Sequence, residues 1–332
     1  MTILLTLLIT GVIFVNGFTD APGAITGVVV TRTLSYRAAV LLAAGCNLLG
    51  IAVMAVWSAS VANTMLGLAG ASNAAAAHAA AALGAAMLSI IIFAVGAWYF
   101  GIPTSESHAL IAALAAGSLA IAGEADMRGW DKVAAGLVLS LVMGLLLGYL
   151  LQRFPGVMLA RLSPRTLGGA QILGASASAF MHGAQDGQKF IAVLVLAQMI
   201  SSGRPPGDIV NLALHIPEVL LCALAMGLGT AMGGRRIIYN VGAKMVGMDK
   251  AQTVCSDIAS SLVLLLASLT GIPMSTTHAK TSAIMGAGLG SRSKVNPRVI
   301  SGMLTAWAVT FPVCGVLGYL LTKLFIAVLA KL

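Results

Sequence analysis

The sequence predicts an all-α polytopic membrane protein built from two inverted repeats. The chain of 332 residues is 59% hydrophobic and only 9% charged, and its mean hydropathy is +0.98. Soluble domains of this length do not have such a composition. Short motifs also recur at a fixed spacing in the two halves, and each half has an apolar segment that polar residues interrupt. These features are typical of a transporter in the cytoplasmic membrane.

Several motifs of the first half return 170 residues later. The matching groups are Gly101-Ile102-Pro103 with Gly271-Ile272-Pro273, His108-Ala109 with His278-Ala279, and Gly148-Tyr149-Leu150-Leu151 with Gly318-Tyr319-Leu320-Leu321. Asp20 and Asp186 match at a slightly different spacing of 166. Two-fold repeats with corresponding interrupted segments are the sequence signal of a secondary transporter, whose binding site lies between the repeats. We therefore predict a first repeat at residues 1–152, a cytoplasmic linker at 153–165 and a second repeat at 166–332.

Each repeat is expected to contain three crossings and a re-entrant helical hairpin with its tip at Gly-Ile-Pro. In the first repeat the apolar segments are 2–30, 38–56, 83–100, 109–121 and 133–152. Residues 58–82 carry no Lys, Arg, Asp or Glu and are expected to form a connector or a partly helical surface segment. The second repeat has the same order: a segment around Asp186, then 209–232, 256–269, residues up to 289, and 299–321. The helices that contain Asp20 and Asp186 are expected to be broken at the midplane.

Because each repeat crosses the membrane an odd number of times, the two repeats have inverted orientations. If both termini lie outside the cell, the basic loops fall in the cytoplasm. These loops are 31–37, 153–165, 233–250 and 289–298, and they hold 12 of the 19 Lys and Arg residues. The outer side holds Arg128, Lys132, Arg204, Lys323 and Lys331, while Lys189 and Lys280 fall within the membrane. This bias agrees with the positive-inside rule. Topology thus explains the net charge of +9, which is no sign of nucleic-acid binding.

The stretch from Met181 to Lys189 places polar and ionisable side chains inside a long apolar segment. An Asp near the bilayer midplane costs roughly 2.5–3.5 kcal/mol on insertion scales, so Asp186 belongs by default to an ion or substrate path. Gly183 and Gly187 weaken the helix at this point, and a break is tolerated in lipid only where it lines a cavity or is covered by protein. Residues 15–24 form a weaker copy of this stretch around Asp20.

The two hairpin tips are predicted to hold an oxyanion. Each tip places hydroxyl groups and free N–H groups where a new helix begins, and a helix N-terminus suits a negative charge. For one tip alone, plain N-capping by Ser or Thr is the better interpretation. Two tips at matching positions of an inverted repeat favour an anion site instead. The predicted anion-binding residues are Thr104, Ser105, Ser107, Gln188, Ser275, Thr276 and Thr277.

Asp20 and Asp186 suit a coupling cation, because an ionised carboxylate cannot bind an anion directly. Thr19, Gln185 and exposed main-chain carbonyls would supply further oxygen ligands. The alternative is proton coupling, in which a buried Asp changes its protonation during the cycle. A second alternative is a structural ion pair between Asp186 and Lys189.

Four residues are accessory candidates: Glu106, His182, Lys189 and Glu218. A carboxylate at Glu106 should repel an anion, so this side chain points away, is protonated or pairs with a bound cation. Glu218 is a further candidate for proton or cation coupling if it is embedded in the membrane. A lone His in a packed interior is more often structural than a ligand, although His108 and His278 follow the tips and could orient them.

The sequence resembles the inorganic phosphate transporter (PiT) family of cation-coupled symporters over essentially its whole length, as a short bacterial-type member. The similar motifs are residues 182–189 (HGAQDGQK), 226–234 (MGLGTAMGG) and 273–279 (PMSTTHA). The resemblance implies an inverted-repeat fold, inorganic phosphate held between the two hairpin tips, and sodium or protons bound near Asp20 and Asp186. It also implies that the coupling ion is the only cofactor.

The sequence departs from the family pattern beside each aspartate. The Asn that precedes the aspartate in that pattern is Thr19 in one copy and Gln185 in the other, and the first tip has Glu106 where the second has Thr276. These changes leave sodium and proton coupling open, and they leave sulfate or another tetrahedral oxyanion as the alternative substrate. Phosphate can donate a hydrogen bond and sulfate cannot, so an acceptor such as Glu106 would mildly favour phosphate.

Other classes of function find little support. No nucleophile elbow, metal motif or nucleotide-binding loop is present, so we expect no enzyme, and uphill transport must use an ion gradient. A channel could also have inverted repeats and broken helices, but paired carboxylates beside anion-binding tips fit coupled transport better. Small-residue helix faces permit a homodimer without requiring one.

Overall fold

The computed structural model describes residues 2–68, 75–102, 104–123, 129–203, 210–239 and 245–331. Within these ranges the regular elements are helices and no strand is present. The first half contains α1 (Thr2–Thr19), η1 (Ala21–Ile25), α2 (Thr26–Val30), α3 (Tyr36–Trp57), α4 (Ser60–Leu68), α5 (Ala76–Tyr99), α6 (Glu106–Ala122) and α7 (Trp130–Arg153). After α8 (Pro155–Leu159), the second half contains α9 (Pro164–Ser202), η2 (Leu212–Leu214), α10 (Ile216–Met232), α11 (Arg235–Ile238), α12 (Lys250–Thr270), α13 (Thr276–Gly290) and α14 (Pro297–Leu329).

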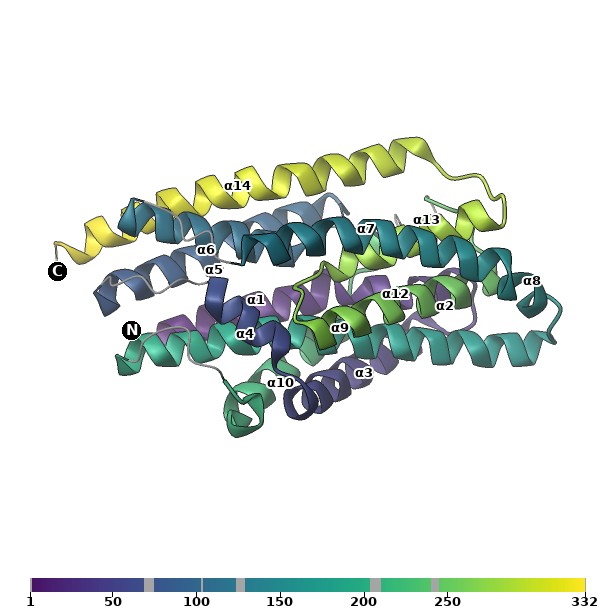
Figure 1. The fold of residues 1–332 in the computed structure, drawn as a ribbon, viewed down its shortest axis with the longest axis horizontal. Helices are drawn as coiled ribbons and strands as arrows, with labels where there is room; N and C mark the ends of the chain where they lie inside the picture. Colours follow the sequence, from purple (N-terminus) through teal and green to yellow (C-terminus); the bar gives the residue numbers. More distant parts are fainter. Residues whose placement is uncertain are drawn as a thin grey trace.

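The helices are long and apolar enough for a polytopic membrane protein. Six stretches meet the length and hydropathy expected of a membrane span: Thr2–Val30, Tyr36–Trp57, Ala76–Tyr99, Trp130–Arg153, Lys250–Thr270 and Pro297–Leu329. The long helices run along one common axis, and both chain termini lie at the same end (Figure 1). The all-α polytopic fold predicted from composition is confirmed.

Equivalent helices of the two halves exchange packing partners. Helix α7 packs against α13 and α14 packs against α6, while α3 packs against α9 and α10 against α1. Such an exchange is expected of two repeats; the boundaries at 1–152 and 166–332 and the opposite orientation across a membrane stay predictions.

Small residues at every fourth position make the α7–α13 and α14–α6 contacts close. The buried face of α7 includes Gly136, Ser140, Gly144 and Gly148. A Cβ atom on Gly148 would lie 2.3 Å from the Ala283 carbonyl oxygen of α13. The buried face of α14 has the same spacing, with Thr310, Cys314, Gly318 and Thr322. Small side chains let membrane helices approach until their backbones touch.

The predicted helix break is present at Asp20 and absent at Asp186. Helix α1 ends at Thr19, and the 3₁₀ turn η1 follows with Pro22, which lacks the N–H that a continuing helix needs. Helix α9, in contrast, runs unbroken through Asp186 from Pro164 to Ser202, so the prediction of a break there is wrong.

The glycines beside Asp186 allow contact with a neighbouring helix. A Cβ atom on Gly183 would lie 2.2 Å from the Asn47 carbonyl oxygen of α3. One on Gly187 would lie 2.5 Å from the Ile51 side chain. These glycines therefore let α3 reach the backbone of α9, and the helix keeps its hydrogen bonds.

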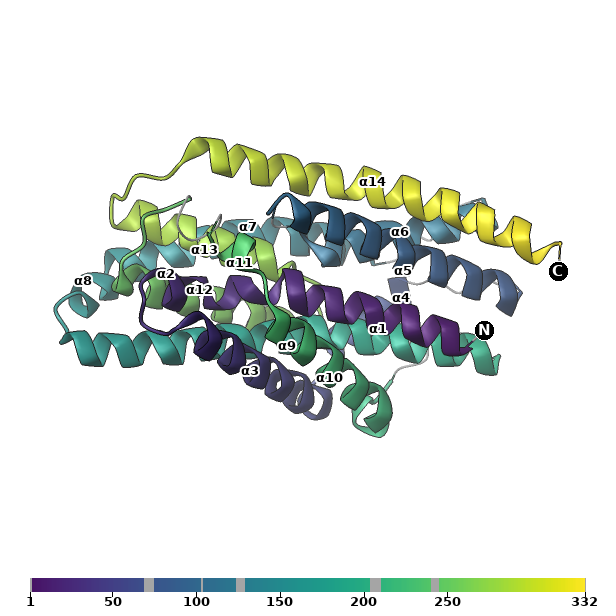
Figure 2. The same cartoon turned by 180° about the vertical axis from the view of Figure 1, so that it is seen from behind.

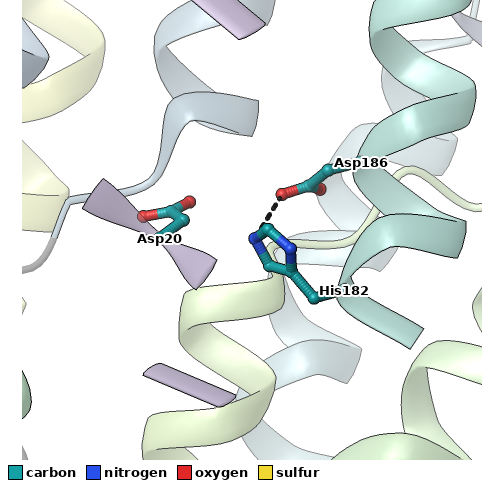
Figure 3. Close-up of side chains that lie close together, drawn as sticks. All are labelled: Asp20, His182 and Asp186. Carbon is teal, nitrogen blue, oxygen red and sulfur yellow. Dashed lines mark ion pairs between the residues drawn. The ribbon is translucent and has the colours of Figure 1, made fainter. Parts of the chain in front are cut away.

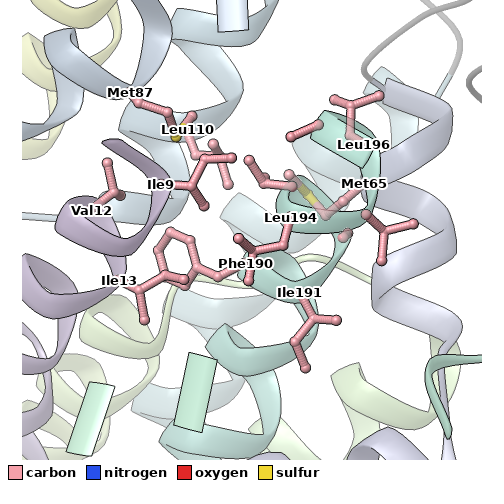
Figure 4. Close-up of a cluster of buried hydrophobic side chains, with 14 of the residues drawn as sticks. Ile9, Val12, Ile13, Met65, Met87, Leu110, Phe190, Ile191, Leu194 and Leu196 are labelled. Carbon is pink, nitrogen blue, oxygen red and sulfur yellow. The ribbon is translucent and has the colours of Figure 1, made fainter. Parts of the chain in front are cut away.

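Of residues 58–82, the described part is mostly helical, as the second of the two alternatives predicted, but much of it is buried and not at the surface; residues 69–74 lie outside the described residues. Helix α4 buries Val61, Ala62, Met65 and Leu66, which recur with helical spacing and pack into the main apolar cluster. Helix α5 begins at Ala76, earlier than expected. Figure 4 shows part of this cluster, where Ile9 and Ile13 of α1 meet Phe190 and Leu194 of α9. The cluster holds the two Asp-bearing segments together on one side of the site.

The linker and the last predicted cytoplasmic loop lie at the end of the molecule opposite the termini (Figures 1 and 2). The linker carries Arg153, Arg161 and Arg165, and the loop before α14 carries Arg292 and Lys294. Arg128, Arg204 and Lys244, which belong to the charge count, lie outside the described residues. The placement of both termini outside the cell stays a prediction.

Candidate functional site between two hairpin tips

The two predicted hairpin tips meet in the interior of the molecule. Helices α5 and α6 form one hairpin, and α12 and α13 form the other. The turns start in the same way, with Gly101 at φ +68° and Gly271 at φ +72°, a backbone conformation that glycine adopts without strain. Ser105 and Ser275 then cap the new helices by accepting hydrogen bonds from the N–H groups of residues 108 and 278.

The cap serines also contact each other across the repeat. The Ser105 hydroxyl donates to the Ser275 hydroxyl at 2.9 Å, and both side chains are buried. The N-termini of α6 and α13 therefore converge on one point, as the anion-site prediction requires. Thr104, Ser107, Thr276 and Thr277 lie in the same region, and the first three are buried.

Asp186 is surrounded by hydrogen-bond donors. Its carboxylate accepts from the Lys189 ammonium at 2.6 Å, from the Thr276 hydroxyl at 3.1 Å and from the Asn16 amide at 3.3 Å. The His182 Nε2 atom lies 3.4 Å from the same carboxylate. Because α9 is continuous here, Lys189 and His182 reach Asp186 from one turn after it and one turn before it.

Asp20 has a different environment, with few donors and a second carboxylate. The Asn16 amide is 3.5 Å from its carboxylate, and Glu106 and Thr277 are close enough to interact with it. Glu106 itself accepts a hydrogen bond of 2.6 Å from the Thr19 hydroxyl. Three buried oxygens around Asp20 make no hydrogen bond within 3.5 Å to the described residues: Asn16 Oδ1, Glu106 Oε2 and Thr277 Oγ1. Unpaired buried oxygens fit a site for a hard cation.

The two carboxylates and His182 form one compact group. Ligand atoms of Asp20, His182 and Asp186 lie within 4.8 Å of one another. Figure 3 shows Asp20 facing Asp186, with the imidazole of His182 below them. The other ring nitrogen of His182 lies 3.1 Å from the Asn47 side-chain oxygen, and Asn47 in turn donates to Thr230 at 3.0 Å. This chain of contacts fixes the imidazole ring from α3 and α10.

A small cavity adjoins this group. It measures about 20 Å³ and is lined by Thr19, Asp20, His182, Thr276, Thr277 and Lys280, among others. That volume accommodates roughly one water molecule. Ser105 and Ser275 are in hydrogen-bond contact, so an anion that binds between the tips requires them to separate.

Three sequence-predicted residues contact other parts of the molecule. Gln185 donates to the Ile272 carbonyl at 3.0 Å and accepts from Ser268 at 2.6 Å, so it attaches α9 to the second hairpin. Gln188 accepts from the Val61 N–H at 3.1 Å and thereby holds the start of α4. Glu218 lies in the first turn of α10, bonded to Gln198, with His215 at 3.6 Å.

Two elements of the site were missed from the sequence. Asn16 reaches both carboxylates; its position one helical turn before Asp20 is the signal that could have identified it. Asp257 forms a second buried ion pair with Lys280, which also donates to Ser178 at 3.2 Å. An acidic residue in the middle of the apolar helix α12 is the corresponding sequence signal.

The sequence is similar to known transporters over almost its whole length. A family model described as "Phosphate transporter family" matches residues 16–164 and 160–318. A "Probable low-affinity inorganic phosphate transporter" of Bacillus subtilis (strain 168) is 30% identical over 96% of this chain and 95% of its own length. A protein with the same description from Rhizobium meliloti (strain 1021) is also 30% identical, over 92% of this chain and 91% of its own length.

A solved structure shares the fold. The protein titled "The sodium-dependent phosphate transporter" superimposes with a TM-score of 0.86, covering 98% of this chain and 99% of its own, at 18% identity. The fold and these relatives lead to one conclusion: the chain is a multi-pass membrane protein of the phosphate transporter family, and not an enzyme.

Proposed function

We propose that this protein carries inorganic phosphate across the cytoplasmic membrane together with sodium or a proton, with the anion held between the two hairpin tips. The observation that carries the proposal is the contact between Ser105 and Ser275. It brings the N-termini of two helices together, each with unpaired main-chain N–H groups and a partial positive charge. Two such ends can hold a tetrahedral anion from opposite sides once they separate.

Coupling follows from the charges around this point. Asp20, Glu106 and Asp186 are buried together, and Lys189 is a buried cation that pairs with Asp186. Uncompensated carboxylates repel an incoming phosphate, whereas a cation or proton taken up at Asp20 removes part of that repulsion. Each ligand then raises the affinity for the other, because the coupling between two binding sites is reciprocal. The unpaired oxygens of Asn16, Glu106 and Thr277 support a cation position at Asp20.

Radiolabelled phosphate uptake into proteoliposomes tests the proposal. Sodium and proton gradients are imposed separately, excess sulfate is the competitor, and Asp186→Asn is the inactive control. Uptake that one gradient drives and sulfate leaves unchanged is expected, and the effective gradient names the coupling ion. Transport of sulfate or another oxyanion in place of phosphate would contradict the substrate assignment, and uptake without any gradient would contradict coupling.

A further inference from the structure

Lys189 has the oxygen contacts that a bound inorganic cation would have. Its ammonium nitrogen lies 2.6 Å from an Asp186 carboxylate oxygen, 2.6 Å from the Ser107 hydroxyl and 2.5 Å from the Met274 carbonyl oxygen. The side chain is only 1% exposed. A carboxylate, a hydroxyl and a main-chain carbonyl are the types of ligand that hard cations take in transporters.

These ligands come from all three parts of the site. Asp186 lies on α9, Ser107 lies in the first turn of α6, and Met274 lies at the tip of the second hairpin. The ammonium therefore links both hairpins to α9. Since α9 is unbroken and Lys189 is one turn from Asp186, the charge is covalently attached to the same rigid element as its carboxylate.

Among the described residues, no Lys or Arg side chain pairs with Asp20 as Lys189 pairs with Asp186. Asp20 is accompanied by Glu106, and the nearby oxygens of Asn16, Glu106 and Thr277 lack partners within the described part of the chain. One carboxylate region is thus supplied with a cation by the protein, and the other has open oxygen ligands. The cation position of the second half is therefore filled by the Lys189 ammonium, and the corresponding position of the first half, at Asp20, is open.

We propose that Lys189 is a tethered cation that permanently takes the cation position of the second half, so that the transport cycle uses a single exchangeable cation position, at Asp20. The inference rests on the proposed function and adds to it the number of cation positions and the residue that sets this number. Removal of the ammonium should vacate a sodium site made by Asp186, Ser107 and Met274.

Equilibrium binding of ²²Na⁺ to the purified full-length protein tests this directly. Lys189→Ala should bind about one more sodium ion per chain than the wild type, whereas Lys189→Arg, the matched control that keeps the charge, should bind the same number as the wild type. The double variant Asp186→Asn/Lys189→Ala should lose the additional ion. Equal sodium binding by Lys189→Ala and wild type would overturn the proposal.

Thermal unfolding in sodium chloride and choline chloride provides the second measurement. Sodium should raise the melting temperature of Lys189→Ala by roughly 3 °C more than that of the wild type, because a ligand that binds only the folded state stabilises it. If Lys189→Ala and Lys189→Asn both aggregate in either salt, sodium does not replace the ammonium and the proposal fails. Both measurements compare variant with wild type, so they stay valid if the wild type couples to protons or transports another anion.

Discussion

The two hairpin tips have the same backbone and different chemistry. Gly101 and Gly271 adopt the same left-handed conformation, and Ser105 and Ser275 cap the following helices in the same way. The next residue differs: Glu106 contacts Thr19 near Asp20, whereas Thr276 donates to Asp186. The acidic tip thus faces the half without an attached cation, and the hydroxyl tip faces the half in which Lys189 pairs with the carboxylate.

The two halves therefore share the backbone geometry of the tips but differ in the charged side chains beside them. The repeated backbone brings two helix N-termini together, which requires only glycine at the turn and serine at the cap. The charges are distributed unequally between the halves. The side of Asp20 and Glu106, called the open side, has carboxylates without a paired cation among the described residues, and the side of Asp186 and Lys189, called the closed side, has an ion pair. Four sets of variants test this contrast.

The largest effect is expected from breaking the closed side. Lys189→Met leaves Asp186 buried without its cation, which should lower the free energy of unfolding by about 3–5 kcal/mol. Asp186→Asn added to Lys189→Met removes the unpaired charge and should recover most of that loss. The measurement is unfolding in choline chloride, free of sodium. A double variant no more stable than Lys189→Met would show that charge pairing is not what stabilises this side.

The second largest effect is expected from removing the Asp20 carboxylate, which has no paired cation in the described part of the chain. Asp20→Asn should lower gradient-driven phosphate uptake by roughly 100-fold, near the upper range of coupling energies, while the amide keeps the side chain's shape. Uptake in proteoliposomes under the effective gradient provides the measurement, with protein quantity and monodispersity as controls. Gradient-driven uptake at the wild-type rate would exclude Asp20 as the coupling position.

Exchange of the residues that distinguish the tips should have a moderate effect. Glu106→Thr copies the second tip into the first and should weaken dependence on the coupling cation by about tenfold, because one acid leaves the open side. Thr276→Glu places an acid beside Asp186 and should reduce uptake more than Glu106→Thr does. Cation titrations of initial uptake rates compare the two. Equal losses would argue that the halves are interchangeable.

The smallest effect is expected from removing the cap serines, and the loss of stability should be the same in both halves. Ser105→Ala and Ser275→Ala each remove a helix cap and one side of the contact between the tips. Each should cost about 1 kcal/mol of unfolding free energy. The two losses should agree, because the caps have the same geometry. Unequal losses in thermal or denaturant unfolding would show that the backbone symmetry does not extend to energetics.

The repeated tips were predictable because their signal is local and occurs twice. A Gly-Ile-Pro turn, a cap serine and a spacing of 170 residues identify both. The unbroken α9 was not predictable in this way, since Gly183 and Gly187 serve the contact with α3, and only the packed structure supplies that neighbour.

Long-range contacts also decide the remaining side chains. Gln188 looks like an anion ligand by its position near Asp186, yet its amide oxygen holds the α4 backbone. Asn16 and the Asp257–Lys280 pair acquire their partners from other helices. Sequence spacing orders the residues along one helix but does not specify which side chain of a distant segment faces them.

The continuity of α9 has a mechanical consequence. Its 39 residues form a rod of about 58 Å, nearly twice the roughly 30 Å hydrocarbon layer of a bilayer. A continuous helix of this length is rigid, so Asp186 and Lys189 keep a fixed position relative to each other. Asp20 lies at the break where α1 ends and the 3₁₀ turn η1 begins. We therefore expect a motion that opens the site to occur mainly at this break beside Asp20, while α9 moves Asp186 and Lys189 together as one rigid element.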